Sequence, residues 1–225
     1  MIVFDKVCKK FPEQHLRSGH ARAAFALENV SFEIKRGELA LLTGHSGAGK
    51  STLMRLIPAL ERATTGQVRV GDQDVSKLSR RELPYFRRKL GLMLQDQTLL
   101  DDRNAFDNVV LPLVIAGLRH KEASQRVHAA LERVGLAGCE RAFPAELSGG
   151  EQQRLQIARA IVSRPAVLIA DEPTAHLEAS LAAEIAKLFD GFRHAGTTII
   201  VSTHDTSPFD RYATRKLHLD HGHLQ

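Results

Sequence analysis

The chain has 225 residues, of which 43% are hydrophobic and 25% are charged, proportions typical of a folded globular domain. Its 31 Lys and Arg residues exceed its 26 Asp and Glu residues, and the formal charge of +5 suits an anionic nucleotide, an anionic membrane surface or nucleic acid. No apolar run approaches the ~20 residues that span a bilayer, and the N-terminus lacks the basic-then-apolar layout of a secretion signal. We therefore expect a chain that is neither secreted nor membrane-spanning. Its two cysteines, Cys8 and Cys139, lie far apart, so we expect reduced thiols in a cytosolic protein.

Short strands and turns make up the start of the chain. Residues 1–7 predict an edge strand, and residues 27–34 alternate apolar and polar side chains, the period of a half-buried strand. The apolar residues 38–43 predict a buried strand, and residues 51–57 predict a helix that follows it closely. A further short strand is expected at residues 67–70.

A glycine-rich loop joins that buried strand to the helix, with the sequence GHSGAGKST at residues 44–52. It fits the pattern G-x-x-x-x-G-K-[ST], in which glycines let successive N–H groups point at one anion. Lys50 can reach the β- and γ-phosphates, and the Ser51 hydroxyl can bind Mg²⁺. The sequence therefore predicts a nucleoside triphosphate site, whose residues here are Gly44, His45, Ser46, Gly47, Ala48, Gly49, Lys50, Ser51 and Thr52.

The middle of the chain changes from strands to helices. Residues 79–89 are rich in basic side chains and predict a solvated helix face, with contact to an anionic membrane as the alternative. Residues 90–94 predict a buried strand that ends at Gln95. Residues 96–163 show helical periodicity and no strand signal. We expect them to form a helical subdomain inserted into an α/β core made by residues 1–95 and 164–225 of one domain.

A second glycine-containing motif, LSGGEQQR, occupies residues 147–154. Ser148 and Glu151 have the spacing of a capping box, and Gly149 and Gly150 let backbone N–H groups approach a ligand. One nucleotide does not need two phosphate-binding helix starts from one subunit. The motif therefore predicts two subunits placed head to tail, each completing the ATP site of the other.

Two carboxylates, Asp171 and Glu172, directly follow the apolar residues 166–170, which predict a strand of a parallel sheet. Ligands bind at the carboxyl ends of such strands, where Asp171 can hold Mg²⁺ through water and Glu172 can polarise an attacking water. Residues 197–202 predict another buried strand.

The last strand is expected at residues 216–219, close to a group of three histidines. We interpret the histidines as part of a solvated tail, because no cysteine or carboxylate set supports a structural metal site. They are His218, His221 and His223.

The chain resembles the ATP-binding-cassette (ABC) ATPases over essentially its whole length. The resemblance rests on five features in a fixed order: the phosphate-binding loop, Gln95, LSGGEQQR, Asp171-Glu172 and the STHD of residues 202–205. The resemblance implies an α/β fold with a RecA-like P-loop core, an N-terminal antiparallel β-subdomain and an inserted helical subdomain. It also implies hydrolysis of ATP to ADP and phosphate by a homodimer closed around two Mg·ATP.

The resemblance further implies roles for single residues. Gln95 would contact Mg²⁺ and report the nucleotide state to a membrane partner, His204 would contact the γ-phosphate, and Glu172 would be the general base. Ser148 and Gly150 would reach the nucleotide of the other subunit. Phe11 would stack on adenine, with ordinary apolar packing as the alternative.

Three segments, residues 42–51, 83–88 and 107–109, resemble the bacterial cell-division branch of this family. That resemblance implies a transmembrane partner of the FtsX type, control of cell-wall hydrolysis, and a peripheral location on the cytoplasmic face of the inner membrane at the division septum. We expect no nucleic-acid partner. Candidate residues for docking to the membrane partner are Leu99, Leu100, Phe106 and Val109.

Other functions remain as alternatives. The ATPases of lipoprotein release and macrolide efflux share the architecture and much of the motif set. A cassette ATPase acting on nucleic acid or ribosomes is compatible with the charge, although such proteins usually carry coiled-coil insertions or tandem cassettes. The third alternative is a nucleotide-gated structural module, in which ATP-driven closure is the signal.

One segment departs from the family pattern. After the DEPT of residues 171–174, relatives usually continue Gly-Asn-Leu-Asp, whereas this chain has Ala175, His176, Leu177 and Glu178. Since the segment normally lines the dimer interface, we predict a working motif with altered coupling between the two ATP sites.

Overall fold

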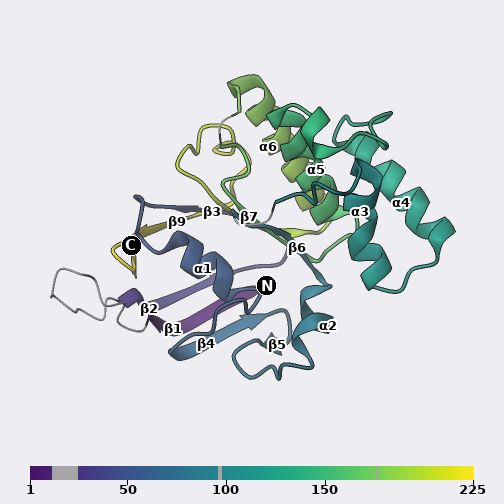
Figure 1. Ribbon diagram of the computed structural model, residues 1–225. Coiled ribbons are helices and arrows are strands. Elements are labelled where there is room, and N and C mark those ends of the chain that lie inside the picture. Colours follow the sequence, from purple (N-terminus) through teal and green to yellow (C-terminus); the bar gives the residue numbers. More distant parts are fainter. Residues whose placement is uncertain (12–24, 96–97, 176) are drawn as a thin grey trace, which may run out of the picture.

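A six-stranded sheet forms the α/β core of the computed structural model, which describes residues 1–11, 25–95, 98–175 and 177–225 (Figure 1). The strand order is β10-β9-β3-β8-β7-β6. Strands β9, β3, β8, β7 and β6 run parallel, and β10 is antiparallel to β9. The carboxyl ends of the parallel strands therefore meet at one edge. The strands are β3 (Leu39–Thr43), β6 (Leu90–Met93), β7 (Val167–Asp171), β8 (Thr198–Ser202), β9 (Arg215–Asp220) and β10 (His223–Leu224).

A separate antiparallel sheet lies on the other side of helix α1 (Lys50–Leu56) from the core sheet (Figure 1). Its strand order is β2-β1-β4-β5. Strand β1 pairs with both β2 and β4, so the prediction of an edge strand at residues 1–7 is wrong. Both pairing partners come later in the chain, and the weak alternation of β1 carries no information about them. The strands are β1 (Ile2–Lys10), β2 (Phe25–Ile34), β4 (Thr65–Val70) and β5 (Gln73–Asp74).

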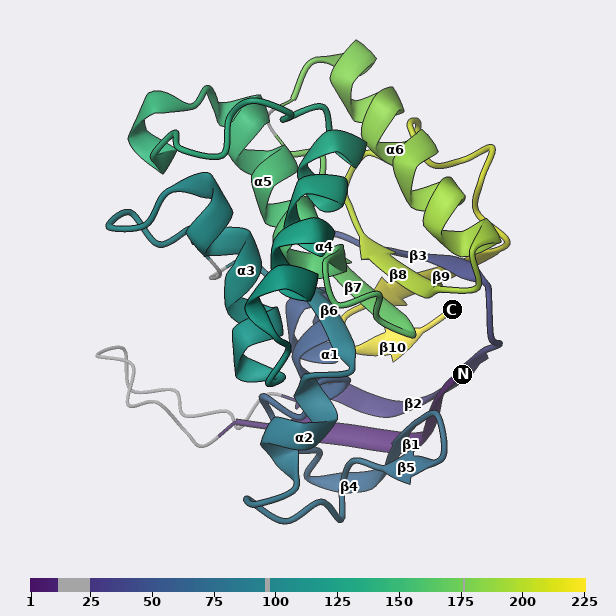
Figure 2. The same cartoon turned by 90° about the vertical axis from the view of Figure 1, so that its right-hand side faces the viewer.

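Three helices that follow β6 in the chain gather at one end of the molecule (Figure 2). They are α3 (Ala105–Ile115), α4 (His120–Arg133) and α5 (Gly149–Ile161), with the 3₁₀ turn η1 (Pro144–Glu146) before α5. Helix α6 (Ala179–His194) lies between β7 and β8 in the chain. In the part of the chain that the structure describes, no helix is long and apolar enough to cross a membrane.

Strand β3 contributes to two hydrophobic cores. Leu39 and Leu41 pack into the cluster that includes α3 to α6, whereas Ala40 and Leu42 pack into the cluster formed with α1 and the antiparallel sheet. All four residues have no exposed surface. Burial on both faces explains why β3 is a continuous apolar run instead of an alternating one.

The basic segment at residues 79–89 is helical only over α2 (Leu83–Arg87). Arg87 donates hydrogen bonds to the carbonyl oxygens of Pro58 (2.9 Å) and Ala59 (2.6 Å), just after α1 ends. Carbonyls at a helix C-terminus lack intrahelical partners, and a cation there also offsets the helix dipole. The predicted solvated face is therefore wrong for Arg87, although Arg80, Arg81, Arg88 and Lys89 are exposed.

Buried Asn108 ties the segment after Gln95 to α3. Its Oδ1 accepts the N–H of Leu100 (2.8 Å), and its Nδ2 donates to the carbonyl oxygens of Leu100, Arg103 and Asn104. A buried amide with these bonds holds the loop and the helix as one unit.

The predicted docking residues divide into two groups. Leu99 and Val109 are 6% and 0% exposed, and Phe106 packs partly buried against the helical core. For Leu99 and Val109 the prediction is therefore wrong, since the apolar pattern reflected core packing. Leu100 is 40% exposed.

A hairpin of β9 and β10 ends the chain, so the strand near residues 216–219 is not the last one. His218 and His223 lie in its strands, and the N–H of Gly222 in its turn donates to the carbonyl oxygen of Ala48 (3.0 Å). The three histidines are exposed, as predicted, but they belong to a hairpin and not to a tail. A two-residue strand such as β10 is too short for a periodic signal.

Candidate functional site

Four loops meet at the carboxyl edge of the core sheet, one after each of β3, β6, β7 and β8. Together they line a cavity of about 840 Å³. Most of the predicted site residues lie in it, as expected for ligand sites of open parallel sheets. Those that line the cavity are Ser46, Gly47, Gly49, Lys50, Ser51, Thr52, Gln95, Asp171, Glu172 and His204.

Backbone geometry explains two of the glycines in the phosphate-binding loop. Gly44 and Gly49 have φ values of 146° and 106°, which side chains rarely adopt. A Cβ on Gly49 would also overlap the carbonyl oxygen of Ala26, and one on Gly44 would overlap that of Leu219. The loop can therefore pass this close to β2 and β9 only with glycine at these positions.

Lys50 lies at the first position of α1 and is only 7% exposed. Its ammonium donates to the carbonyl oxygens of Gly44 (2.7 Å) and His45 (3.1 Å). Burial lowers the pKa of Lys50 from its ordinary value, and the nearby carboxylates of Glu172 and Asp171 oppose that shift. The site therefore combines one buried cation with two carboxylates.

Glu172 has a strained backbone with a φ of 52°. Its Oε2 accepts the N–H of His204 at 3.4 Å, and its Oε1 lies 3.4 Å from His204 Nε2. Among the described residues, Oε1 is buried without a hydrogen bond. Glu172 lines the cavity, so its carboxylate lies where a general base is required.

Phe11 is 41% exposed and lies under the ammonium of Lys9, 4.7 Å from the ring centroid. It lines a smaller cavity of about 260 Å³, whose other walls include Ser51, Gln95 and Asp171. Phe11 is thus close to the phosphate-binding loop without lining the main cavity.

The LSGGEQQR segment begins α5, and its predicted capping box is confirmed. Ser148 Oγ accepts the N–H of Glu151, and Glu151 Oε2 accepts the N–H of Ser148 at 2.8 Å. Ser148, Gly149, Gly150 and Glu151 do not line the cavity formed by the phosphate-binding loop. In one copy of the chain, the glycines of the second motif therefore lie outside the cavity that the phosphate-binding loop lines.

Gly150 has a packing role that the sequence did not reveal. A Cβ there would come within 2.6 Å of Leu181 Cδ2. The glycine therefore leaves room for the Leu181 side chain of α6 in its present position.

Sequence reasoning missed the polar face that α5 turns toward the cavity. Gln153 and Gln156 line it, and Gln153 donates to the carbonyl oxygen of Pro173 (2.7 Å), next to Glu172. Thr203 from the loop after β8 also lines the cavity. Two glutamines three residues apart on one helical face were the available signal.

The segment that departs from the family pattern, residues 175–178, is described except for one residue. His176 lies outside the described residues. Glu178 is the exposed N-cap residue of α6, and its side chain makes no capping hydrogen bond. The predicted change in coupling between two sites stays a prediction.

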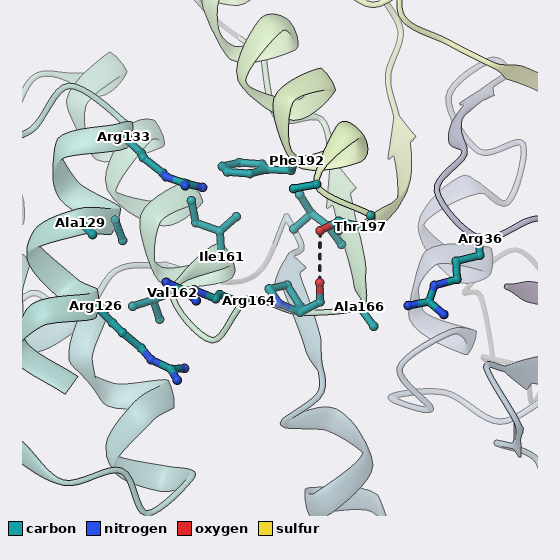
Figure 3. Close-up of a pocket in the computed structure, with 15 residues that line it drawn as sticks. Arg36, Arg126, Ala129, Arg133, Ile161, Val162, Arg164, Ala166, Phe192 and Thr197 are labelled. Carbon is teal, nitrogen blue, oxygen red and sulfur yellow. Dashed lines mark hydrogen bonds between the residues drawn. The ribbon is translucent and has the colours of Figure 1, made fainter. Parts of the chain in front are cut away.

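A second cavity of about 550 Å³ contains none of the predicted site residues. Figure 3 shows arginines from several elements around an apolar wall that includes Ile161 and Phe192, with Thr197 donating to the Pro165 carbonyl oxygen (3.3 Å). Ala166 and Thr197 precede β7 and β8, so this cavity lies at the opposite edge of the sheet. The sequence did not reveal it because its arginines are scattered along the chain: Arg36, Arg126, Arg133 and Arg164.

Comparisons with known proteins agree with this geometry. A family model described as ABC transporter matches residues 27–175. The cell division ATP-binding protein FtsE of Escherichia coli (strain K12) is 46% identical over 211 residues, which are 94% of this chain and 95% of that protein. FtsE of Haemophilus influenzae is 42% identical over 225 residues, covering 100% of both chains. The methionine import ATP-binding protein MetN of Bradyrhizobium diazoefficiens is 40% identical, and the match covers 64% of that protein.

A solved structure extends the similarity to three dimensions. The dimeric post-hydrolysis state of the ATP-binding cassette MJ0796, bound to ADP and Pi, has a TM-score of 0.90 and 31% identity, covering 100% of this chain and 97% of that one. This confirms the predicted α/β P-loop fold class. The chain belongs to the ABC ATPases, the ATP-hydrolysing cassettes, and is similar to their FtsE-type members over nearly its whole length.

Proposed function

We propose that two copies of this chain bind two Mg·ATP between them and couple ATP hydrolysis to a transmembrane partner of the FtsX type, and thereby to cell-wall hydrolysis during division. The observation that carries the catalytic part is the convergence of four loops, with Lys50, Gln95, Glu172 and His204, on one cavity. The similarity to FtsE proteins supports the cell-division part. On this proposal the chain works peripherally, on the cytoplasmic face of the inner membrane at the division septum.

Each side chain at the cavity has a role in this proposal. Lys50 and the backbone N–H groups of its loop bind the β- and γ-phosphates and stabilise the charge that develops on the transferring group. Ser51, Gln95 and Asp171 offer the oxygen ligands that Mg²⁺ prefers, and the ion would neutralise phosphate charge. Phe11, beside the loop, stacks on adenine.

Hydrolysis itself requires an oriented water. Glu172 accepts its proton through the carboxylate at the cavity, while His204, within 3.4 Å of that carboxylate, holds the γ-phosphate. The strained backbone of Glu172 fixes the direction of the carboxylate. Closure on ATP and reopening after product release then move the helices that follow Gln95.

The start of LSGGEQQR, residues 148–151, lies outside the cavity, and this position supports a site shared between two copies. In this arrangement Ser148, Gly149, Gly150 and Glu151 of one subunit face the nucleotide on the loop of the other. The exposed helix start of α5 provides N–H groups and a positive dipole end for that contact.

Replacing Ser148 with Arg tests the shared site. In a Glu172→Gln background, which holds ATP, we expect Ser148→Arg to abolish ATP-dependent dimers in size-exclusion chromatography while ATP affinity of the monomer changes by less than about 3-fold, under 0.7 kcal/mol. The control is Ser163→Arg, just beyond the other end of α5, which should still dimerise. If Ser148→Arg abolishes ATP binding by the monomer, both motifs belong to one intramolecular site and the proposal is wrong.

The docking surface proposed for the transmembrane partner lies on α3 and the loop before it. Val114 and Ile115 are 59% and 51% exposed, Leu100 is 40% exposed and Leu111 is 38% exposed. These side chains replace the buried Leu99 and Val109 as candidates. Because Asn108 holds the loop to α3, movement after Gln95 reaches this surface directly.

The paired change Val114→Glu and Ile115→Glu tests this surface. We expect co-purification with the FtsX-type membrane protein to fall at least about 10-fold, because two charges in an apolar interface cost more than 1.4 kcal/mol. ATP hydrolysis by the isolated chain should stay unchanged. Leu60→Glu, at another exposed leucine, is the matched control. Unchanged co-purification would place the docking surface elsewhere.

The alternatives differ in their partners. An ATPase of lipoprotein release or macrolide efflux would co-purify with a different membrane protein. An ATPase acting on nucleic acid or ribosomes would show binding that weakens steeply with salt. The co-purified protein therefore decides among these functions.

A further inference from the structure

Two histidines and one carboxylate converge beside the phosphate-binding loop, outside the ATP cavity described above. His45 belongs to that loop, while Asp220 is the last residue of β9 and His221 begins the turn of the β9–β10 hairpin. One nitrogen of each histidine and one oxygen of Asp220 lie within 4.8 Å of one another. We propose that these three residues bind a divalent transition-metal ion, with Zn²⁺ as the best fit, and that the ion links the phosphate-binding loop to the hairpin.

Distances at the carboxylate fit such an ion. Nε2 of His45 lies 3.2 Å from Oδ1 of Asp220, and Nε2 of His221 lies 3.8 Å from the same oxygen. With metal–ligand distances of about 2.0–2.2 Å, ligand atoms of a tetrahedral zinc lie about 3.3–3.6 Å apart. The side chain of His221 is 80% exposed, so a small rotation can bring its nitrogen into that range.

The outer contacts orient the ligands. Nδ1 of His45 lies 2.6 Å from the carbonyl oxygen of Ser46, an acceptor, which assigns the proton of the neutral ring to Nδ1. In this neutral ring the lone pair of Nε2 faces the Asp220 carboxylate, so either a metal ion or a second ring proton must lie between them. The second oxygen of Asp220 accepts the side-chain N–H of Gln225 at 3.2 Å. Bonds of this kind position metal ligands in known sites.

The backbone holds the two parts of the site together without a metal. Gly222 donates to the Ala48 carbonyl oxygen, and its own carbonyl oxygen accepts the N–H of Glu28. His221 has a φ of 44°, and its ring lies beside that of His45, with centroids 4.5 Å apart. The ligands therefore need little ordering when an ion binds.

The donor set selects the class of ion. Imidazole nitrogen favours Zn²⁺, Cu²⁺ and Ni²⁺, whereas Mg²⁺ prefers oxygen ligands. Three protein ligands leave a fourth position for water. The two remaining histidines of the hairpin have other partners: His218 Nδ1 lies 2.9 Å from Thr43 Oγ1, and His223 Nε2 lies 3.5 Å from a Glu28 oxygen. They are matched controls.

Isothermal titration of the nucleotide-free full chain with ZnCl₂ in a non-chelating buffer tests the site. We expect one equivalent to bind, and His221→Gln and Asp220→Asn each to weaken that binding at least 10-fold, while His218→Gln and His223→Gln leave it unchanged. Titration with Co²⁺ should give visible absorption of a tetrahedral complex in the wild type and not in His221→Gln. Circular dichroism checks that each variant is folded.

Several outcomes would overturn the proposal. Absence of stoichiometric binding would mean that protonated histidines form only ion pairs with Asp220. Binding that survives both His221→Gln and Asp220→Asn would place the ion elsewhere, for example at the thiols of Cys8 or Cys139. Loss of binding in His218→Gln or His223→Gln would likewise assign the ion to ligands other than the proposed three.

Discussion

Glu172→Gln is expected to bind ATP, form the closed dimer and turn over about 10²–10⁴-fold more slowly than the wild type, the range that a general base contributes. The glutamine keeps the shape of the side chain but cannot take a proton from water. It also removes a negative charge from the cavity that binds the anionic phosphates, so ATP affinity should not fall. Single-turnover hydrolysis and ATP-dependent dimerisation measure the two properties separately.

Two comparison variants sharpen this experiment. Glu184→Gln, at an exposed position of α6, should leave turnover unchanged. Lys50→Ala should instead lose ATP affinity by about 10–150-fold, equivalent to about 1.5–3 kcal/mol for a charged hydrogen bond. Turnover of Glu172→Gln near the wild-type rate would show that another group is the base. In cells, a function that needs ATP-driven closure alone would survive Glu172→Gln and fail with Lys50→Ala.

Gly49→Ala should destabilise the chain far more than Gly47→Ala, a substitution in the same loop. The methyl group forces an alanine into a φ near 106° and overlaps the Ala26 carbonyl oxygen of β2. The backbone strain alone costs about 1–3 kcal/mol, and the overlap adds to it. A loss of about 3 kcal/mol corresponds to a Tm lower by about 6–12 °C for a chain of this size.

Gly47→Ala is the matched control, because it shares the positive φ (81°) but meets nothing within 4 Å. Its Tm should fall by about 2–6 °C, corresponding to about 1–1.5 kcal/mol. Differential scanning calorimetry measures both variants, and ATP titration shows whether the displaced loop still binds phosphate. Equal losses in the two variants would mean that the contact with β2 is relieved at no cost.

Motifs whose chemistry depends on contiguous residues were predictable from the sequence. The phosphate-binding loop, Asp171-Glu172 and the capping box at Ser148 each combine local geometry with a recognisable spacing. The buried strands β3, β7 and β8 were predicted because strands covered on both faces are continuous apolar runs.

Features that depend on distant contacts were not predictable. The central position of β1 depends on partners that come later in the chain. From the sequence, Leu99 was predicted to lie in an exposed interface and Arg87 on a solvated face. In the structure Leu99 is buried in the core, and Arg87 binds carbonyl oxygens after α1. The arrangement of His45 with His221 requires β3 to pair with β9, strands that are far apart in the sequence.

Sharing β3 between two hydrophobic cores has a thermodynamic consequence. Alternate residues of this strand complete different clusters. If either cluster came apart, the apolar side chains on one face of β3 would be exposed to water. The chain should therefore unfold as one cooperative unit, despite its two sheets and separate group of helices. A nucleotide bound at the end of β3 would then raise the free energy of unfolding of the whole chain, and amide exchange would slow in the antiparallel sheet as well as around the ATP cavity.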